Sequence, residues 1–164
     1  MKHTLKALLV LAALGNCTAA LATPLQAFTE HSLAQIEQQR SGEDFLLVLW
    51  SVHCAPCFAE LALLAEALQA NPQLPIELVS TDAPDMRADV EATLERYGLA
   101  AHASWQFAEN MPDKLRFYID PGWYGELPRS YFYDAAQQRS GHSGALTRAQ
   151  LQDWLGTRAV LGAE

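Results

Sequence analysis

The hydrophobic pattern is dominated by an unbroken apolar run at residues 45–50, Phe-Leu-Leu-Val-Leu-Trp. Such a run predicts a strand that is buried on both faces, as in a parallel sheet. Apolar residues then recur at helical spacing, which predicts a helix over residues 54–70. Residues 75–81 alternate between apolar and polar and predict a second strand. The apolar stripe of the helix consists of Phe58, Leu61, Leu64, Ala65 and Leu68.

The elements around this unit follow from the same pattern. After a turn, residues 86–97 are apolar along one side and predict another helix. Strand, helix, strand and helix in this order predict a parallel pair of strands with a right-handed crossover. Upstream, a lead-in at residues 23–28 precedes a predicted helix at 29–41, which a Ser32–Gln35 capping box would begin.

The second half of the chain predicts a hairpin followed by a helix. Residues 129–134 alternate and predict a strand, and residues 139–143 are its expected hairpin partner. A final helix is predicted over residues 147–155, begun by a Thr147–Gln150 capping box. A βαβ unit followed by ββα predicts an α/β fold, with a mixed central sheet and helices on both faces.

The region between these halves has a weaker pattern. Residues 103–107 predict a short strand, and residues 112–118 predict a short helix. Aromatic side chains in such patterns usually pack inside, so we expect four of them in the core. They are Trp105, Phe107, Phe117 and Tyr118.

Residues 1–22 predict a secretory signal peptide. Two lysines precede an apolar run at 7–14 that is too short to span a bilayer, and Ala20-Leu21-Ala22 matches a cleavage site. Lipidation of Cys17 is a minor alternative, because the residue before it is not small. Cleavage would leave residues 23–164 as one exported domain without a membrane anchor.

Charge restricts the partners of this domain. The chain has a net charge of −8, and the predicted signal holds two of the basic residues and none of the acidic ones. The exported domain would therefore be more acidic still. Because such a charge repels nucleic acid and anionic lipid, we expect no nucleic-acid partner and no polybasic attachment to membranes.

The exported domain would keep two cysteines, Cys54 and Cys57, at the start of the helix that follows the apolar strand. An oxidising compartment lets such a pair form a disulfide. As a structural staple so small a loop contributes only about 2 kcal/mol, and a domain of this size has room for its own core. A thiol at a helix N-terminus has a lowered pKa, and its thiolate is a nucleophile. The pair therefore predicts redox exchange, in which Cys54 attacks a partner disulfide and Cys57 resolves the mixed disulfide.

Two neighbours of the cysteines are candidate participants. Glu60 follows Cys57 by three residues and could accept its proton, with a solvated surface glutamate as the alternative. His53 precedes Cys54 and, as a cation, would stabilise the thiolate. It is otherwise an exposed loop residue, or a third ligand that would hold Cu(I) with the two sulfurs. A copper-handling protein and a redox-inert domain with a permanent disulfide are therefore alternative functions.

The stretch Trp50-Ser51-Val52-His53-Cys54-Ala55-Pro56-Cys57 resembles the active site of the thioredoxin superfamily, and most closely that of exported TlpA-like thiol–disulfide oxidoreductases. Glu60 and Glu126-Leu127-Pro128 resemble further positions of that family. The resemblance covers roughly residues 30–157. It implies a thioredoxin-like fold for the domain at 23–164, with an insertion within residues 82–120 between the βαβ and ββα halves.

The resemblance also implies a function. It implies a periplasmic oxidoreductase that reduces specific exported proteins, such as cytochrome c apoproteins or copper-site proteins, without a cofactor. A membrane-bound redox partner would recycle the dithiol. Pro128 would be a cis proline facing the cysteines, although by base rate alone its peptide bond would be trans. Leu127 would offer its backbone to an incoming peptide, beside His53, which stands where relatives carry Trp. Val48 stands where cytosolic thioredoxins carry a buried acid.

Overall fold

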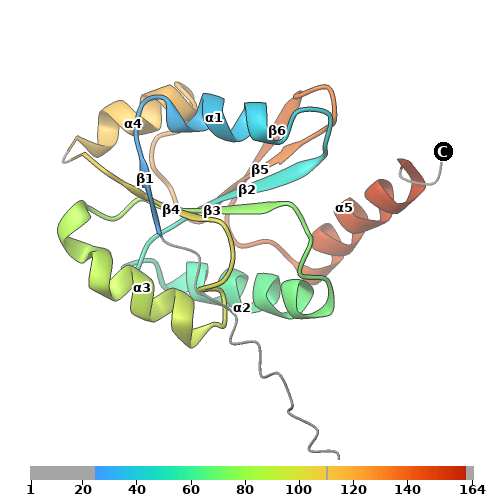
Figure 1. The fold of residues 1–164 in the computed structure, drawn as a ribbon, viewed down its shortest axis with the longest axis horizontal. Helices are drawn as coiled ribbons and strands as arrows, with labels where there is room; N and C mark the ends of the chain where they lie inside the picture. Colours follow the sequence, from blue (N-terminus) through green and yellow to red (C-terminus); the bar gives the residue numbers. More distant parts are fainter. Residues whose placement is uncertain (1–24, 110, 162–164) are drawn as a thin grey trace, which may run out of the picture.

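A computed structural model describes residues 25–109 and 111–161 (Figure 1). The predicted signal peptide, with Cys17, lies outside the described residues, so export remains a prediction. The described chain forms a six-stranded sheet with the strand order β1-β4-β3-β2-β5-β6. The strands are β1 (Gln26–Phe28), β2 (Phe45–Trp50), β3 (Ile76–Ser80), β4 (Ser104–Phe107), β5 (Arg129–Tyr133) and β6 (Arg139–Ser143). The helices are α1 (Ser32–Gln39), α2 (Ala55–Ala70), α3 (Arg87–Arg96), α4 (Pro112–Ile119) and α5 (Arg148–Leu161), with a 3-10 turn η1 (Pro84–Met86).

The sheet is mixed, as the order of predicted elements requires. β2 pairs in parallel with β3, and β4 pairs in parallel with both β3 and β1. β5 pairs antiparallel with β2 and with β6. The predicted parallel pair and the predicted hairpin are therefore confirmed.

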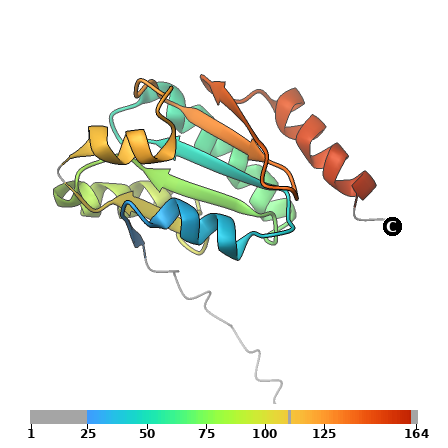
Figure 2. The same cartoon turned by 90° about the horizontal axis from the view of Figure 1, so that it is seen from above.

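Helices cover both faces of the sheet, as Figures 1 and 2 show. One apolar cluster includes residues of α2, α3 and α5, and the other includes residues of α1 and α4. All six residues of β2 are buried, because alternate side chains of this central strand enter opposite clusters. Leu46, Val48 and Trp50 enter the first cluster, and Phe45, Leu47 and Leu49 enter the second.

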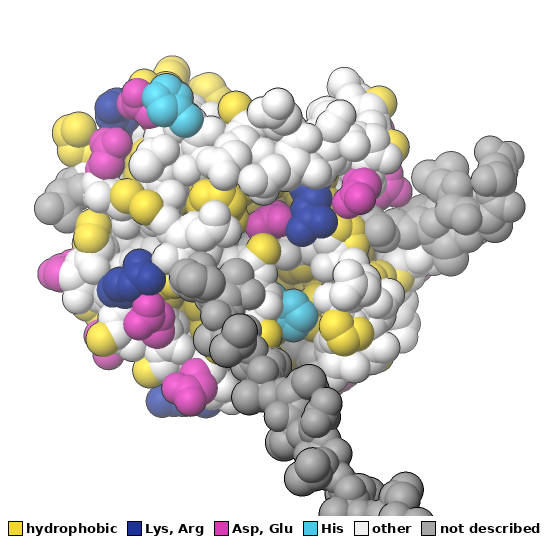
Figure 3. Space-filling view, in the orientation of Figure 1, with side chains coloured by type: hydrophobic (Ala, Val, Ile, Leu, Met, Phe, Trp, Pro, Cys, Tyr) yellow, Lys and Arg dark blue, Asp and Glu magenta, His cyan; other side chains and the backbone are white. Residues whose placement is uncertain are grey.

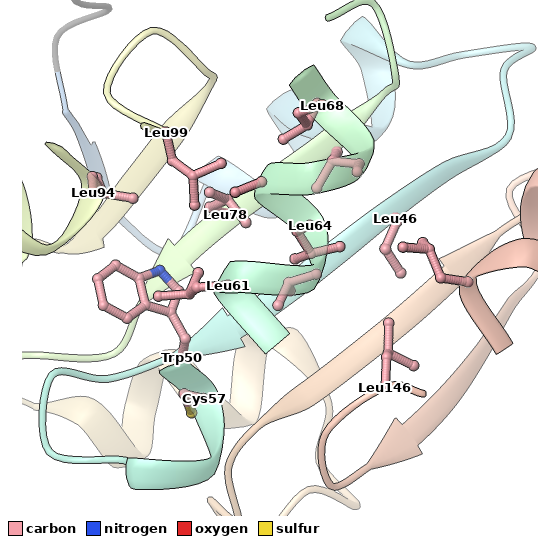
Figure 4. Close-up of a cluster of buried hydrophobic side chains, with 14 of the residues drawn as sticks. Leu46, Trp50, Cys57, Leu61, Leu64, Leu68, Leu78, Leu94, Leu99 and Leu146 are labelled. Carbon is pink, nitrogen blue, oxygen red and sulfur yellow. The ribbon is translucent and has the colours of Figure 1, made fainter. Parts of the chain in front are cut away.

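The first cluster fixes the start of α2 against the end of β2 (Figure 4). Leu61 and Leu64 of α2 are fully buried in it, as are Trp50 of β2 and Leu78 of β3. Burying one such leucine side chain contributes roughly 1.5–3 kcal/mol. Cys57 belongs to the same cluster, so the packing that stabilises the fold also holds one of the two cysteines.

Two expectations for the N-terminal segment are wrong. The lead-in at residues 23–28 contains a strand, β1, which pairs with β4. Ser32 does not form a capping box with Gln35, because it lies inside α1 and is buried. Its Oγ accepts the backbone N–H of Thr29 (2.9 Å) and donates to the carbonyl of Ala27 (3.3 Å). The serine therefore closes the turn between β1 and α1.

The prediction for the aromatic residues is half correct. Trp105 and Phe107 of β4 are buried, but Phe117 and Tyr118 of α4 are 64% and 47% exposed. Because α4 is only eight residues long, it turns a single narrow face, which includes Leu115, toward the sheet. The side chains of Phe117 and Tyr118 lie outside that face.

The capping box predicted at the start of α5 is confirmed. The backbone N–H of Thr147 donates to Oε1 of Gln150 (2.9 Å), and the backbone N–H of Gln150 donates to Oγ1 of Thr147 (3.2 Å). Each side chain thereby satisfies a backbone donor that the helix leaves open. The last helix is thus anchored at the end nearest the sheet.

Acidic and basic side chains lie next to one another on the face shown in Figure 3. Within α3, for example, Arg87 and Glu91 form an ion pair of 2.9 Å between exposed side chains. Exposed pairs of this kind contribute at most about 1 kcal/mol each. The fold is therefore stabilised mainly by the two apolar clusters.

Candidate active site

The two cysteines lie where β2 ends and α2 begins. Cys54 is the N-cap residue of α2, with extended backbone angles (φ −104°, ψ 97°), and Pro56 occupies the first turn, where no backbone N–H is needed. Cys54 and Cys57 form a disulfide. Cys57 is fully buried, whereas Cys54 is partly exposed. A reaction partner can therefore reach the disulfide through Cys54.

Glu60 lies one helical turn after Cys57 and is only 1% exposed, so the alternative of a solvated surface glutamate is wrong. Its Oε1 accepts the O–H of Ser130 on β5 (2.8 Å), whereas its Oε2 is buried without a hydrogen-bond partner among the described residues. Burial raises the pKa of Glu60 to about 7, although the hydrogen bond from Ser130 and the nearby backbone of Leu146 lower it. A carboxyl group with this pKa can exchange a proton near neutral pH, as a general base requires.

The Leu127–Pro128 peptide bond is cis, as the family resemblance implies. The register of β5 on β2 places Arg129 opposite Leu49, so Pro128 lies level with the end of β2. The side chain of Leu127 packs against the cluster that contains Cys57. The loop before β5 therefore lies at the same edge of the sheet as the end of β2, and its position facing the cysteines and its contact with a peptide remain predictions.

The two departures from the family pattern occupy different environments. His53 is exposed in the turn before Cys54. Val48 is buried and stands opposite Ser130 in the pairing of β2 with β5. At the position of Val48 the chain therefore has no buried acid, whereas Glu60, one turn after Cys57 on α2, is a buried carboxyl group.

Two polar residues of this region, Ser130 and Asp82, are not predicted from the sequence alone. Ser130 interrupts the inward face of a predicted strand, and a polar residue at such a position indicates a buried hydrogen-bond partner. Asp82 is buried and accepts the O–H of Ser51 (2.7 Å), just before the cysteines. The predicted parallel pairing of β2 and β3 could have indicated that Asp82 lies near the cysteines, because it brings the carboxyl ends of both strands to one edge of the sheet.

The described residues include no group of three or more His, Cys, Asp or Glu side chains placed to hold a metal ion. The copper alternative, built on His53, Cys54 and Cys57, therefore gains no support. Within residues 25–109 and 111–161, no helix is both long enough and apolar enough to cross a bilayer.

The sequence matches no family model and no curated protein, but solved structures resemble the fold. A secreted Mycobacterium tuberculosis disulfide oxidoreductase homologous to E. coli DsbE is 17% identical, with a TM-score of 0.58; the match covers 73% of this chain and 85% of that one. A thiol:disulfide interchange protein of the thioredoxin family from Chlorobium tepidum is 17% identical, with a TM-score of 0.58 and coverage of 74% and 83%. StoA from Bacillus subtilis is 19% identical, with a TM-score of 0.51 and coverage of 70% and 84%.

Identities this low show the fold and not the reaction. The three matches each span most of both chains, so the likeness covers most of the fold and is not confined to one motif. With a disulfide of Cys-x-x-Cys spacing at the start of α2, this chain has the thioredoxin-like fold of the thiol–disulfide oxidoreductases that it resembles.

Proposed function

We propose that this protein is a thiol–disulfide oxidoreductase that acts through Cys54 and Cys57. The observation that carries the proposal is an accessible sulfur at the N-cap of α2, joined to a buried sulfur one turn along the same helix. The helix N-terminus favours the thiolate of Cys54 once the disulfide is reduced. A structural staple requires neither the accessible sulfur nor its position at the helix end.

The proposed cycle runs in two exchanges. The Cys54 thiolate attacks one sulfur of a partner disulfide, which forms a mixed disulfide and releases the other partner sulfur as a thiolate that takes up a proton. Glu60 accepts the proton of the Cys57 thiol, and the resulting thiolate attacks the Cys54 sulfur. The second partner sulfur leaves as a thiolate, and the Cys54–Cys57 disulfide is restored. Two electrons thereby pass from this protein to its partner.

We further infer that the partners are exported proteins and that the reductive direction is the physiological one. The predicted signal peptide supports export to the periplasm, as does the secreted Mycobacterium tuberculosis oxidoreductase of similar fold. The family resemblance favours cytochrome c apoproteins or copper-site proteins as substrates. It also favours a membrane-bound partner that returns electrons to the dithiol.

The substrate segment is proposed to lie along the loop that ends at the cis peptide bond. Leu127 would pair its backbone with the incoming peptide, and Pro128 would keep that backbone beside Cys54. His53, exposed in the preceding turn, would contact the segment from the other side. These three contacts determine which disulfides reach the accessible sulfur.

Reduction of insulin by dithiothreitol tests the proposed activity. The protein should accelerate precipitation of the insulin B chain, and Cys54→Ser should abolish the acceleration. Cys57→Ser should accumulate a covalent adduct between Cys54 and the B chain, because the resolving thiol is gone. Mass spectrometry detects the adduct, and the Cys54→Ser protein serves as its control. Absence of both acceleration and adduct would refute the proposal.

A further inference from the structure

Asp82, which follows β3, is a buried carboxylate that the proposed cycle does not use. Its Oδ1 accepts the O–H of Ser51 (2.7 Å), while its Oδ2 accepts the O–H of Ser80 (2.7 Å) and the backbone N–H of Val52 (3.0 Å). Three donors thus share its two oxygens, and neither oxygen lacks a partner. A buried carboxylate is costly without such partners, so these groups form one connected unit.

Two of these donors belong to the segment that leads into the active site. The Oγ of Ser51 accepts the backbone N–H of His53 (3.0 Å) while it donates to Asp82. The carbonyl of Ser51 accepts the backbone N–H of Cys54 (3.1 Å). A single residue, Ser51, therefore connects Asp82 to the cysteine that a partner reaches.

The other side of Asp82 is held by the sheet. The backbone N–H of Asp82 donates to Oγ of Ser80 (3.1 Å), and the next residue, Ala83, accepts a hydrogen bond from Nε2 of Gln106 on β4 (2.7 Å). The side chain of Gln106 is itself buried. The support for the segment before Cys54 thus extends across β3 to β4. It is firm because the side chains that form it, those of Ser51, Ser80, Asp82 and Gln106, are buried and hydrogen-bonded.

We propose that Asp82 is a positioning residue of the Cys54–Cys57 pair. Through Ser51 and Val52 it holds Cys54 where this residue closes the disulfide with Cys57. In the dithiol form, a loosely held Cys54 would occupy many positions and would meet Cys57 less often. The network keeps the effective concentration of one thiol at the other high, which favours the disulfide. It therefore makes the dithiol a stronger reductant, which is the direction that the proposed function, on which this inference rests, requires.

The equilibrium with glutathione tests this proposal. The protein dithiol and oxidised glutathione give the protein disulfide and two reduced glutathiones, and acid-quenched alkylation counts the two protein forms. Ser51→Ala should lower this equilibrium constant about threefold or more, the size of one net hydrogen bond. Ser80→Ala is the matched control, because it removes a hydroxyl from the same carboxylate without touching the segment before Cys54. Ser51→Thr keeps the hydroxyl and should restore the wild-type constant.

A network with only a structural role gives a different result. Loss of stability that is equal in the dithiol and the disulfide leaves the equilibrium constant unchanged, because that constant reports only the difference between the two forms. Equal shifts in Ser51→Ala and Ser80→Ala, or no shift in either, would overturn the proposal. Asp82→Asn should lower the equilibrium constant at least as far as Ser51→Ala does. If Asp82→Asn does not fold, the comparison of Ser51→Ala with Ser80→Ala tests the proposal alone. The glutathione equilibrium needs no protein substrate. If the wild-type protein fails to reduce insulin, the proposed function is refuted, but the equilibrium constants of the variants can still be compared.

Discussion

Ser130 limits how far burial raises the pKa of Glu60. Its O–H donates to Oε1 of Glu60 (2.8 Å) and so favours the ionised carboxylate. Ser130→Ala leaves the burial and the nearby backbone of Leu146 unchanged, so we expect the pKa of Glu60 to rise above its value of about 7. Carbon-13 NMR of the Glu60 carboxyl carbon measures this in the disulfide form, in which neither cysteine titrates. Ser130→Thr retains a hydroxyl and is the control; a pKa that is unchanged or lower in Ser130→Ala contradicts the assignment.

At the scale of single elements, the start of α5 matters to the site because it follows Leu146, whose backbone helps to lower the pKa of Glu60. Thr147→Ala removes the side chain that accepts the backbone N–H of Gln150 (3.2 Å). We expect the free energy of unfolding to fall by about 1 kcal/mol, the usual effect of losing an N-cap. Urea unfolding measures it. Thr147→Ser keeps the hydroxyl and should lose much less; equal losses in both variants would show that the cap is not the cause.

The sequence predicts elements well where burial leaves a local pattern. β2 is apolar throughout because helices cover both faces of the sheet, and α2 shows its stripe because one side faces that sheet. β1 was missed because a three-residue strand shows no period of its own; only its pairing with β4, far along the chain, makes it a strand. Phe117 and Tyr118 were misplaced because hydrophobicity alone does not tell which side of an eight-residue helix meets the core.

For the molecule as a whole, some site residues follow from local sequence pattern, whereas others depend on how distant strands pair. Cys54, Cys57 and Glu60 are close in sequence on one helix, so their spacing alone placed them together. Pro128 was placed by resemblance. Ser130 and Asp82 enter only because the order of strands sets β5 on one side of β2 and β3 on the other. Local pattern therefore predicts the residues that we propose to react, whereas the topology determines which residues support them.

Protonation of Glu60 also links the stability of the whole fold to pH. Its pKa is about 7 in the folded protein, against an ordinary value of 4.5 in an unfolded chain. The folded state thus binds the proton more tightly, so this stabilisation is complete below about pH 4.5 and is lost as the pH rises through 7. The loss amounts to at most about 3 kcal/mol.

Glu60→Gln removes this group but keeps its shape, so the wild type should lose more free energy of unfolding than the variant between pH 5 and pH 8. Urea unfolding of both disulfide-bonded proteins at the two pH values measures the difference, because all other titrating groups are common to both. A wild type that loses no more stability than Glu60→Gln would mean that the buried carboxyl does not bind its proton more tightly in the folded state.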